Sequence, residues 1–369
     1  MGKQKNLKNF VLKLGTSVLQ RPEGSFDREL LSSHVKLCAK FWNDEACRFA
    51  IVSSGAIGLG RAQLKLPKSQ VFNTSEKQAC AALGQIHLLK NYQELFGASH
   101  IQVAQVLISP ENFSKREEYL NLKSCIERLL SWNILPILNE NDVVSTFEIE
   151  ENEEKSFGDN DFLASLVASK LSFENLILLT NESGILGENK KTRAQLKASE
   201  LDSIQDFGKS ASGRGGILGK MNAVKMASYF GINTYVAHGK DPKVLEKIFN
   251  ESHSEERSFI PGEKRSFRAK NAWIAFMSGY AAKVVVNKGA EEAILKNGAS
   301  LLPVGCLRVQ GSFDGGDVVA VLNEDGVEFA RGVVKNSADF LENFLKNKNS
   351  LEKTTELIHR DEMVILSCP

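Results

Sequence analysis

The chain has 369 residues, of which 42% are hydrophobic and 25% are charged, and this balance excludes a largely disordered polypeptide. The length predicts two or three domains, because one hydrophobic core rarely organises so many residues. With 46 basic and 45 acidic residues the formal net charge is +1, which excludes a global field that would attract nucleic acid or an anionic membrane. Any anion must therefore be bound locally.

The six cysteines are scattered and form no C-x-x-C pair, which indicates neither a zinc site nor a disulfide framework. Reduced thiols in the cytoplasm are the simplest interpretation. The N-terminal residues lack the apolar core of a secretion signal, and no apolar stretch approaches the roughly 20 residues that cross a bilayer. We therefore expect a cytoplasmic protein with no membrane partner.

Short apolar runs alternate with longer helix-like segments from the N-terminus to about residue 240. The expected strands are 10–14, 49–53, 101–108, 134–138, 176–179 and 233–237. The expected helices are 27–43, 54–64, 74–97, 117–131, 160–171 and 219–230. This alternation predicts an α/β fold whose mostly parallel sheet is sandwiched by helices. Ligands of such sheets bind beyond the carboxyl ends of the strands.

Two changes in texture divide the chain. Residues 188–216 are polar and predict a connection over the sheet, and charge with a Pro-Gly pair interrupts the pattern over 251–270. After about Tyr280 short strands with tight turns predict a compact β-rich module. The expected organisation follows in chain order: an α/β domain over 1–260, a linker over 261–279, a small β-rich domain over 280–352 and a C-terminal tail over 353–369.

The first expected strand contains Lys13 and leads into Gly15-Thr16-Ser17. A charged ammonium in a strand buried on both faces is costly unless an anion meets it. After the second strand, residues 53–60 combine serines and glycines at a helix start, which favours an anion seat for a carboxylate or phosphate. The structural alternatives are an edge or snorkelling lysine and an ordinary capped helix.

Two polar clusters follow, Asn139-Glu140-Asn141-Asp142 and Gly158-Asp159-Asn160-Asp161. Each alone is compatible with helix capping, but two at successive loops of one sheet predict acceptors for a ligand ammonium and a carboxylate that holds a lysine. The run 213–220 then places a glycine-rich turn and Lys220 before a helix, a pattern typical of phosphate binding although it is not a Walker A loop. A flexible linker would explain its glycines but not the lysine.

Several of these segments, in this order, resemble the amino acid kinase family. They are VLKLGTS (11–17), IVSSGAIGLGR (51–61), LPILNENDVV (135–144), FGDNDFLASLVA (157–168), LILLTNESGIL (176–186) and GRGGILGKMNAVKMA (213–227). Residues 283–313 are similar to a PUA domain. The resemblance covers about residues 8–350, and it implies the amino acid kinase fold followed by a small PUA domain.

The resemblance implies ATP-dependent phosphorylation of the side-chain carboxylate of free L-glutamate to γ-glutamyl phosphate, the first step of proline synthesis. It assigns phosphate binding to Lys13, stabilisation of the transferring phosphoryl group to Lys220, and orientation of both lysines to Asp161, so that these three form the catalytic set. Ser54, Asp142 and Asn160 would bind glutamate. The ATP site would be lined by the following residues: Lys13, Thr180, Asn181, Arg214, Gly215, Gly216, Ile217, Leu218, Gly219 and Lys220.

The chain departs from the family pattern at two places. The family usually has Thr-Asp where this chain has Thr180-Asn181, and Gly-Thr-Gly-Gly-Met-x-Thr-Lys where this chain has Arg214, Ile217 and Gly219. The departures concern side-chain contacts to the nucleotide. The resemblance further implies Mg²⁺ bound mainly through the ATP phosphates with no protein metal site, a homo-oligomer, and proline as a feedback inhibitor.

Two alternatives stay open. Another member of the family could act on N-acetylglutamate or carbamate, and fold alone does not separate these substrates. A PUA module could also bind RNA, although residues 281–350 show no dense basic stripe and no interleaved aromatics, so RNA binding has no support in the sequence.

Overall fold

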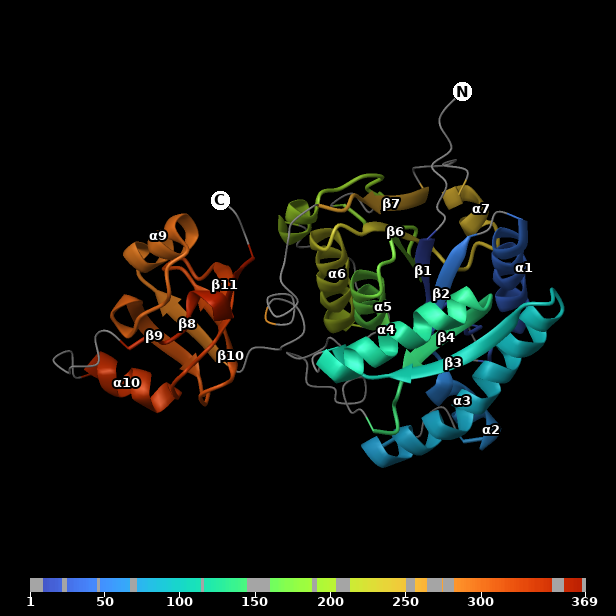
Figure 1. Ribbon diagram of the computed structural model, residues 1–369, viewed down its shortest axis with the longest axis horizontal. Coiled ribbons are helices and arrows are strands. Elements are labelled where there is room, and N and C mark those ends of the chain that lie inside the picture. Colours follow the sequence, from blue (N-terminus) through green and yellow to red (C-terminus); the bar gives the residue numbers. More distant parts are fainter. Residues whose placement is uncertain are drawn as a thin grey trace, which may run out of the picture. The chain divides into compact units, whose positions relative to one another are not determined.

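The computed structural model describes residues 9–21, 25–44, 47–66, 72–113, 116–144, 160–187, 191–203, 213–249, 256–263, 274, 282–346 and 355–366. The chain divides into two compact units, Met1–Arg265 and Ser266–Pro369, which are considered separately (Figure 1). No helix in these ranges is both long and apolar enough to span a membrane.

The first unit contains a seven-stranded sheet in the order β3-β4-β2-β1-β5-β6-β7. Its strands are β1 (Asn9–Leu14), β2 (Arg48–Ser53), β3 (Gln102–Ile108), β4 (Ile134–Glu140), β5 (Asn175–Thr180), β6 (Asn233–His238) and β7 (Arg257–Ile260). All neighbours pair in parallel except β6 and β7, which are antiparallel. The predicted α/β class with a mostly parallel sheet is therefore confirmed.

The seventh strand was not predicted. It has four residues within the charged stretch 251–270, and only Phe259 and Ile260 are apolar, so no periodicity marks it. Its pairing with β6 at the sheet edge supplies the hydrogen bonds that its sequence alone does not suggest.

The helices of the first unit are α1 (Arg28–Asp44), α2 (Ala56–Gln63), α3 (Thr74–Gly97), α4 (Arg116–Ser131), α5 (Asn160–Lys170), α6 (Gly213–Tyr229) and α7 (Val244–Phe249), with 3₁₀ turns η1 (Pro110–Phe113) and η2 (Ala198–Ser203). Figure 1 shows the sheet between α1 and α7 at one side and α5 and α6 at the other.

Strand alternation assigns the two faces of β1. Phe10, Leu12 and Leu14 belong to a core cluster that also contains side chains of α1, α3 and α7. Successive side chains of a strand point to opposite faces, so Lys13 faces the other layer, where α5 contacts β1. This alternation aims the one charged residue of β1 at the N-terminus of α5.

The second unit contains a five-stranded sheet in the order β12-β11-β10-β8-β9. Its elements are β8 (Ala282–Val286), α9 (Lys288–Asn297), η5 (Pro303–Gly305), β9 (Cys306–Gly311), β10 (Val318–Leu322), β11 (Glu328–Val333), α10 (Ala338–Lys346), η7 (Arg360–Glu362) and β12 (Met363–Ile365). Only β8 and β10 pair in parallel. Within the segment expected as a tail over 353–369, β12 completes the sheet, and Leu357, Ile358 and Met363 enter its core.

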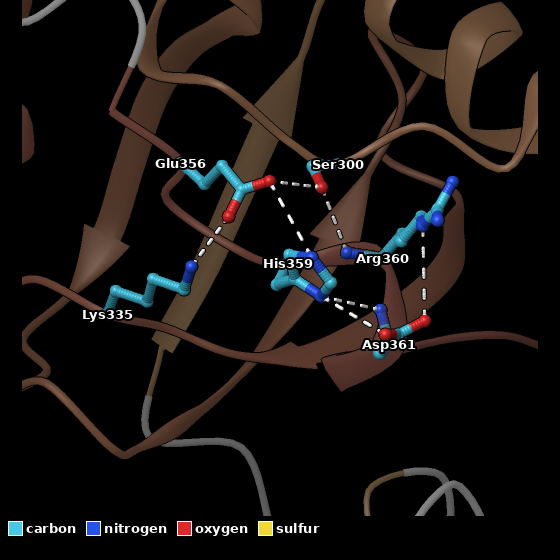
Figure 2. A network of polar contacts seen from close by, with 6 residues as sticks. All are labelled: Ser300, Lys335, Glu356, His359, Arg360 and Asp361. Atoms are coloured by element: carbon cyan, nitrogen blue, oxygen red, sulfur yellow. Dashed lines mark hydrogen bonds and ion pairs between the residues drawn. The ribbon is translucent and has the colours of Figure 1, made fainter.

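A polar network ties this terminal segment to the module (Figure 2). The Glu356 carboxylate accepts hydrogen bonds from the Ser300 hydroxyl at 2.8 Å and from Lys335 Nζ at 2.6 Å. These two donors hold the pKa of Glu356 below its usual value. Ser300 Oγ in turn accepts the backbone N–H of Arg360 at 3.0 Å. These hydrogen bonds anchor the terminal segment to the rest of the second unit.

Candidate active site

Three charged side chains from separate elements meet at the carboxyl end of β1. Lys13 Nζ lies 2.6 Å from Asp161 Oδ1, and both side chains are buried, with exposed fractions of 3% and 0%. Lys220 Nζ, on α6, lies 3.7 Å from the other carboxylate oxygen of Asp161 and is 22% exposed. One carboxylate at the start of α5 therefore links two ammonium groups. The structure thus brings together the three residues to which the sequence assigned catalysis.

The charges of this trio determine its chemistry. Burial raises the pKa of Asp161, but the Lys13 and Lys220 ammonium groups outweigh it and hold that pKa below its usual value. Asp161 is therefore ionised at neutral pH. With both lysines charged, the trio carries one net positive charge in a largely buried position, which favours an anionic ligand.

A network of buried amides continues from the trio. Asn160 Nδ2 donates to the Ser53 carbonyl at 3.0 Å, to Ser54 Oγ at 2.6 Å and to Asn139 Oδ1 at 3.0 Å. Asn139 Nδ2 donates to Gln85 Oε1 at 2.8 Å. Asn160 Oδ1 is buried and has no hydrogen-bond partner among the described residues. A buried acceptor without a partner is unfavourable, so this oxygen fits a ligand donor such as an ammonium group.

A cavity of about 640 Å³ opens beside this network. Its wall includes Asn139, Asp142 and Asn160 from the sheet side and Gly55–Gly58 from the start of α2. The side chain of Asp142 is buried, with 6% exposed. The cavity therefore combines carboxylate and amide acceptors with a helix N-terminus.

The first turn of α2 presents backbone N–H donors that no side chain caps. Its N-cap is Gly55, with φ of 101°, a left-handed conformation that favours glycine, and no side chain caps this helix. The hydroxyl of Ser54 is instead hydrogen-bonded to Asn160. The first backbone N–H groups of a helix have no intrahelical partner, so this turn can seat a carboxylate. The anion seat at this turn stays a prediction, and Ser53 and Ser54 do not cap the helix.

The helix pair α2 and α3 packs unusually closely, and this brings Gln85 into the site. A Cβ atom at Gly84 would lie 1.8 Å from the Ala56 carbonyl oxygen, so only glycine permits this approach. Gln85 is the next residue, and its side chain is 8% exposed. Tyr92, also on α3, makes a 2.9 Å hydrogen bond with the Ser53 hydroxyl.

The predicted nucleotide residues are only partly described. The Thr180 hydroxyl is buried and closes its own turn through a 2.9 Å hydrogen bond from the Glu182 backbone N–H, and Asn181 is exposed. The side chains of the following residues lie outside the described part: Arg214, Gly215, Gly216, Ile217 and Leu218. Their backbone forms the first turns of α6, whereas the sequence placed a turn before a helix at 219. Gly219 is buried within that helix.

Two residues of the site escaped the sequence interpretation. Gln85 and Tyr92 lie on a long helix with no recognisable motif, and α3 has the apolar periodicity of an ordinary packed helix. The Gly84-Gln85 pair was the available signal, because a glycine inside a helix often marks a close approach.

The described residues contain no group of three or more His, Cys, Asp or Glu side chains placed to hold a metal ion. The donors that converge at the site are ammonium groups, amides and helix N–H groups, which bind anions.

Comparisons with known proteins give the following similarities. The model of the amino acid kinase family matches residues 8–238, and that of the PUA domain matches residues 282–351. A glutamate 5-kinase of Thermoanaerobacter sp. (strain X514) is 34% identical over 96% of this chain and 97% of its own length. That of Thermotoga maritima is 37% identical over 90% of each chain, and that of Geobacter sulfurreducens is 32% identical over 98% of each. Among solved structures, a carbamate kinase from Giardia lamblia bound to AMP-PNP gives a TM-score of 0.49 at 14% identity, covering 70% of this chain and 99% of its own.

Proposed function

The chain belongs to the amino acid kinase family, and we propose that it is a glutamate 5-kinase, transferring the γ-phosphoryl group of ATP to the side-chain carboxylate of L-glutamate. The observation that carries the proposal is the pairing of Lys13 and Lys220 with one buried carboxylate, Asp161, beside a cavity rich in acceptors. Relatives that match nearly the whole chain specify glutamate as the substrate.

The cavity provides complementary groups for each end of glutamate. The ligand ammonium group is placed near Asp142 and the unpartnered Asn160 Oδ1, because both are buried acceptors. The carboxylate to be phosphorylated is placed at the first turn of α2, where backbone N–H groups and the helix dipole favour negative charge. The Ser54 hydroxyl accepts a hydrogen bond from Asn160 Nδ2, which links Ser54 to the proposed site of the ligand ammonium group.

The mechanism requires cations rather than a base. A glutamate side chain has a pKa near 4.3 and is ionised at pH 7, so no proton has to be removed from it. The difficulty is the repulsion between this carboxylate and the γ-phosphate. Lys13 and Lys220, held by Asp161, reduce that repulsion and stabilise the charge on the transferring group. Mg²⁺, carried by the ATP phosphates, would supply further positive charge when bound.

The proposal also covers the pathway, the regulation and the cellular location of the enzyme. The product, γ-glutamyl phosphate, enters proline synthesis, and proline is the expected feedback inhibitor. We also propose that the enzyme is a homo-oligomer and that it is located in the cytoplasm. The cytoplasmic location is in keeping with the described cysteines, which are all free: Cys38, Cys47, Cys80, Cys125 and Cys306. Of the nucleotide contacts, Lys13 and Lys220 are proposed for the phosphates, and Thr180, Asn181 and residues 214–219 for the rest of ATP.

The substrate assignment is tested by an ADP-release assay with glutamate, N-acetylglutamate, aspartate and carbamate. We expect kcat/KM for glutamate to be at least about 10²-fold above that for N-acetylglutamate and carbamate, which leave the buried acceptors without an ammonium, and at least about tenfold above that for aspartate, which is one methylene shorter. N-acetylglutamate is the sharpest comparison, because acetylation converts that ammonium group into an amide and leaves both carboxylates unchanged. Faster turnover of N-acetylglutamate or carbamate than of glutamate would refute the assignment.

Gln85 is expected to act as a positioning residue for glutamate. Replacing it by leucine removes the acceptor of the 2.8 Å hydrogen bond from Asn139 and frees the amide that orients Asn160. A buried hydrogen bond lost in this way costs about 1 to 3 kcal/mol, so the KM for glutamate should rise about tenfold while kcat changes little. Steady-state kinetics at varied glutamate measure this split.

Two variants control the Gln85 experiment. Gln85→Glu keeps the acceptor and should restore most of the affinity for glutamate, which a purely structural role of the position does not require. Gln93, on the same helix, is exposed, and Gln93→Leu should behave like the wild type. Equal KM values for Gln85→Leu and the wild type would exclude the positioning role.

A further inference from the structure

A second cavity, of about 210 Å³, lies in the first unit at the carboxyl end of β6 and shares no wall residue with the cavity assigned to glutamate. The polar part of its wall consists of Ser183, His238, Asp241, Lys247, Glu256 and Arg257. Nothing in the proposed kinase mechanism uses these residues.

Arg257 is the unsatisfied group of this cavity. It opens β7 opposite Ala237 of β6, and only 8% of its side chain is exposed. Its Nε and Nη1 groups have no hydrogen-bond partner among the described residues. The Arg257 guanidinium lies over the Tyr235 ring, with Cζ 5.1 Å from the ring centroid. This stacking orients the guanidinium plane, but the ring accepts no hydrogen bond from the N–H groups in that plane. A buried guanidinium in this state calls for a planar oxoanion.

The neighbouring charged side chains restrict the net charge of the anion that this cavity can bind. Lys247 pairs with Asp241 at 2.8 Å and also with Glu256, so both carboxylates have a cationic partner other than Arg257. The four charged side chains of the wall sum to zero, since two are acidic and two basic. A neutral wall favours a ligand with at most one net negative charge, and therefore a carboxylate over a phosphate dianion. At crystal-like packing the volume holds on the order of ten non-hydrogen atoms.

We propose that this cavity binds a small monocarboxylate, either a simple acid or the carboxylate end of a free amino acid, through the guanidinium of Arg257. The Ser183 hydroxyl at the opposite loop provides a second donor. The cavity shares no wall residue with the first cavity, so its occupation does not compete with glutamate there.

Isothermal titration calorimetry of the full-length wild type with acetate, proline and inorganic phosphate tests the proposal. We expect saturable carboxylate binding that Arg257→Gln weakens at least about tenfold, since one charge-assisted pair is lost, and no phosphate binding that depends on Arg257. Acetate binding alone would identify a simple-acid site, and stronger binding of proline would identify an amino acid site. Arg193→Gln removes a surface arginine paired with Glu200 and should bind like the wild type.

Two further variants keep the test decisive. Ser183→Ala alters a partly exposed loop residue and should weaken binding several-fold without affecting the fold, even where Arg257→Gln proves unstable. Asn160→Ala removes a proposed glutamate contact and should leave acetate binding unchanged. Absence of saturable carboxylate binding by the wild type, phosphate binding that Arg257→Gln abolishes, or carboxylate binding unaffected by the Arg257 and Ser183 substitutions would overturn the proposal.

Discussion

Replacing Lys220 by alanine is expected to lower kcat for glutamate phosphorylation by about 10²- to 10³-fold, with less than about a threefold change in the KM for glutamate. Lys220 is 22% exposed, and its Nζ lies 3.7 Å from Asp161, a longer contact than that of Lys13. It is therefore the ammonium that can turn toward a phosphoryl group. Loss of one preorganised contact to the transition state costs about 3 to 4 kcal/mol.

Initial rates at saturating ATP and varied glutamate provide the measurement. Lys225→Ala, on the same helix α6, removes a lysine to which the mechanism assigns no role and should leave kcat within about twofold of the wild type. A large increase in KM with kcat unchanged would instead place Lys220 in ground-state binding, contrary to the role proposed.

Replacing Asp161 by asparagine is expected to abolish measurable activity and to lower the free energy of unfolding of the first unit by about 3 to 5 kcal/mol at pH 7. Asp161 is fully buried, and the substitution removes the negative charge that lies 2.6 Å from the buried Lys13 ammonium. Since the stability of a domain is about 5 to 15 kcal/mol, this is a large fraction of the total. Urea unfolding followed by the fluorescence of buried Trp42, with the other two tryptophans replaced by phenylalanine, reports on this unit.

The contribution of Asp161 to the stability of the first unit should depend on pH. The folded state holds the pKa of Asp161 below its value of about 3.9 in the unfolded chain, so its contribution is complete above that value and is lost as the pH falls through the folded pKa. The difference in stability between wild type and Asp161→Asn should therefore be constant from pH 6 to 8 and shrink below about pH 4.

A surface ion pair provides the comparison for this variant. Glu94 lies 2.7 Å from Arg28 with both side chains well exposed, so Glu94→Gln should cost less than about 1 kcal/mol. Equal effects of the Asp161 and Glu94 substitutions would show that the buried trio does not stabilise the fold.

The sequence predicted the parts of the fold that repeat a simple pattern. Apolar runs marked the six parallel strands; the first of these runs contains Lys13, and the segments between the strands and the next helices supplied Ser54, Asp142 and Asp161. Such runs are visible because both faces of a parallel sheet are buried. The pairing of Lys13 with Asp161 followed from the family resemblance rather than from spacing alone, because it depends on how α5 returns over β1.

The features that were not predicted depend on contacts between distant segments. β7 is specified by pairing with β6, and its charged first residue, Arg257, disguises it as a loop. Gln85 reaches the site because Gly84 lets α3 approach α2, a contact that no local pattern encodes. The beginning of α6 at Gly213 was hidden by glycines, which have low helix propensity. Each of these is a tertiary effect that overrides local preference.

The proposed mechanism requires that Lys13 and Lys220 converge on the phosphates of one ATP molecule. A crystal structure of the enzyme with a non-hydrolysable ATP analogue, Mg²⁺ and glutamate tests it most directly. We predict that both ammonium nitrogens lie within hydrogen-bond distance of the β- and γ-phosphate oxygens and that the glutamate side chain faces the γ-phosphorus. A nucleotide whose phosphates lie beyond the reach of either lysine would contradict it.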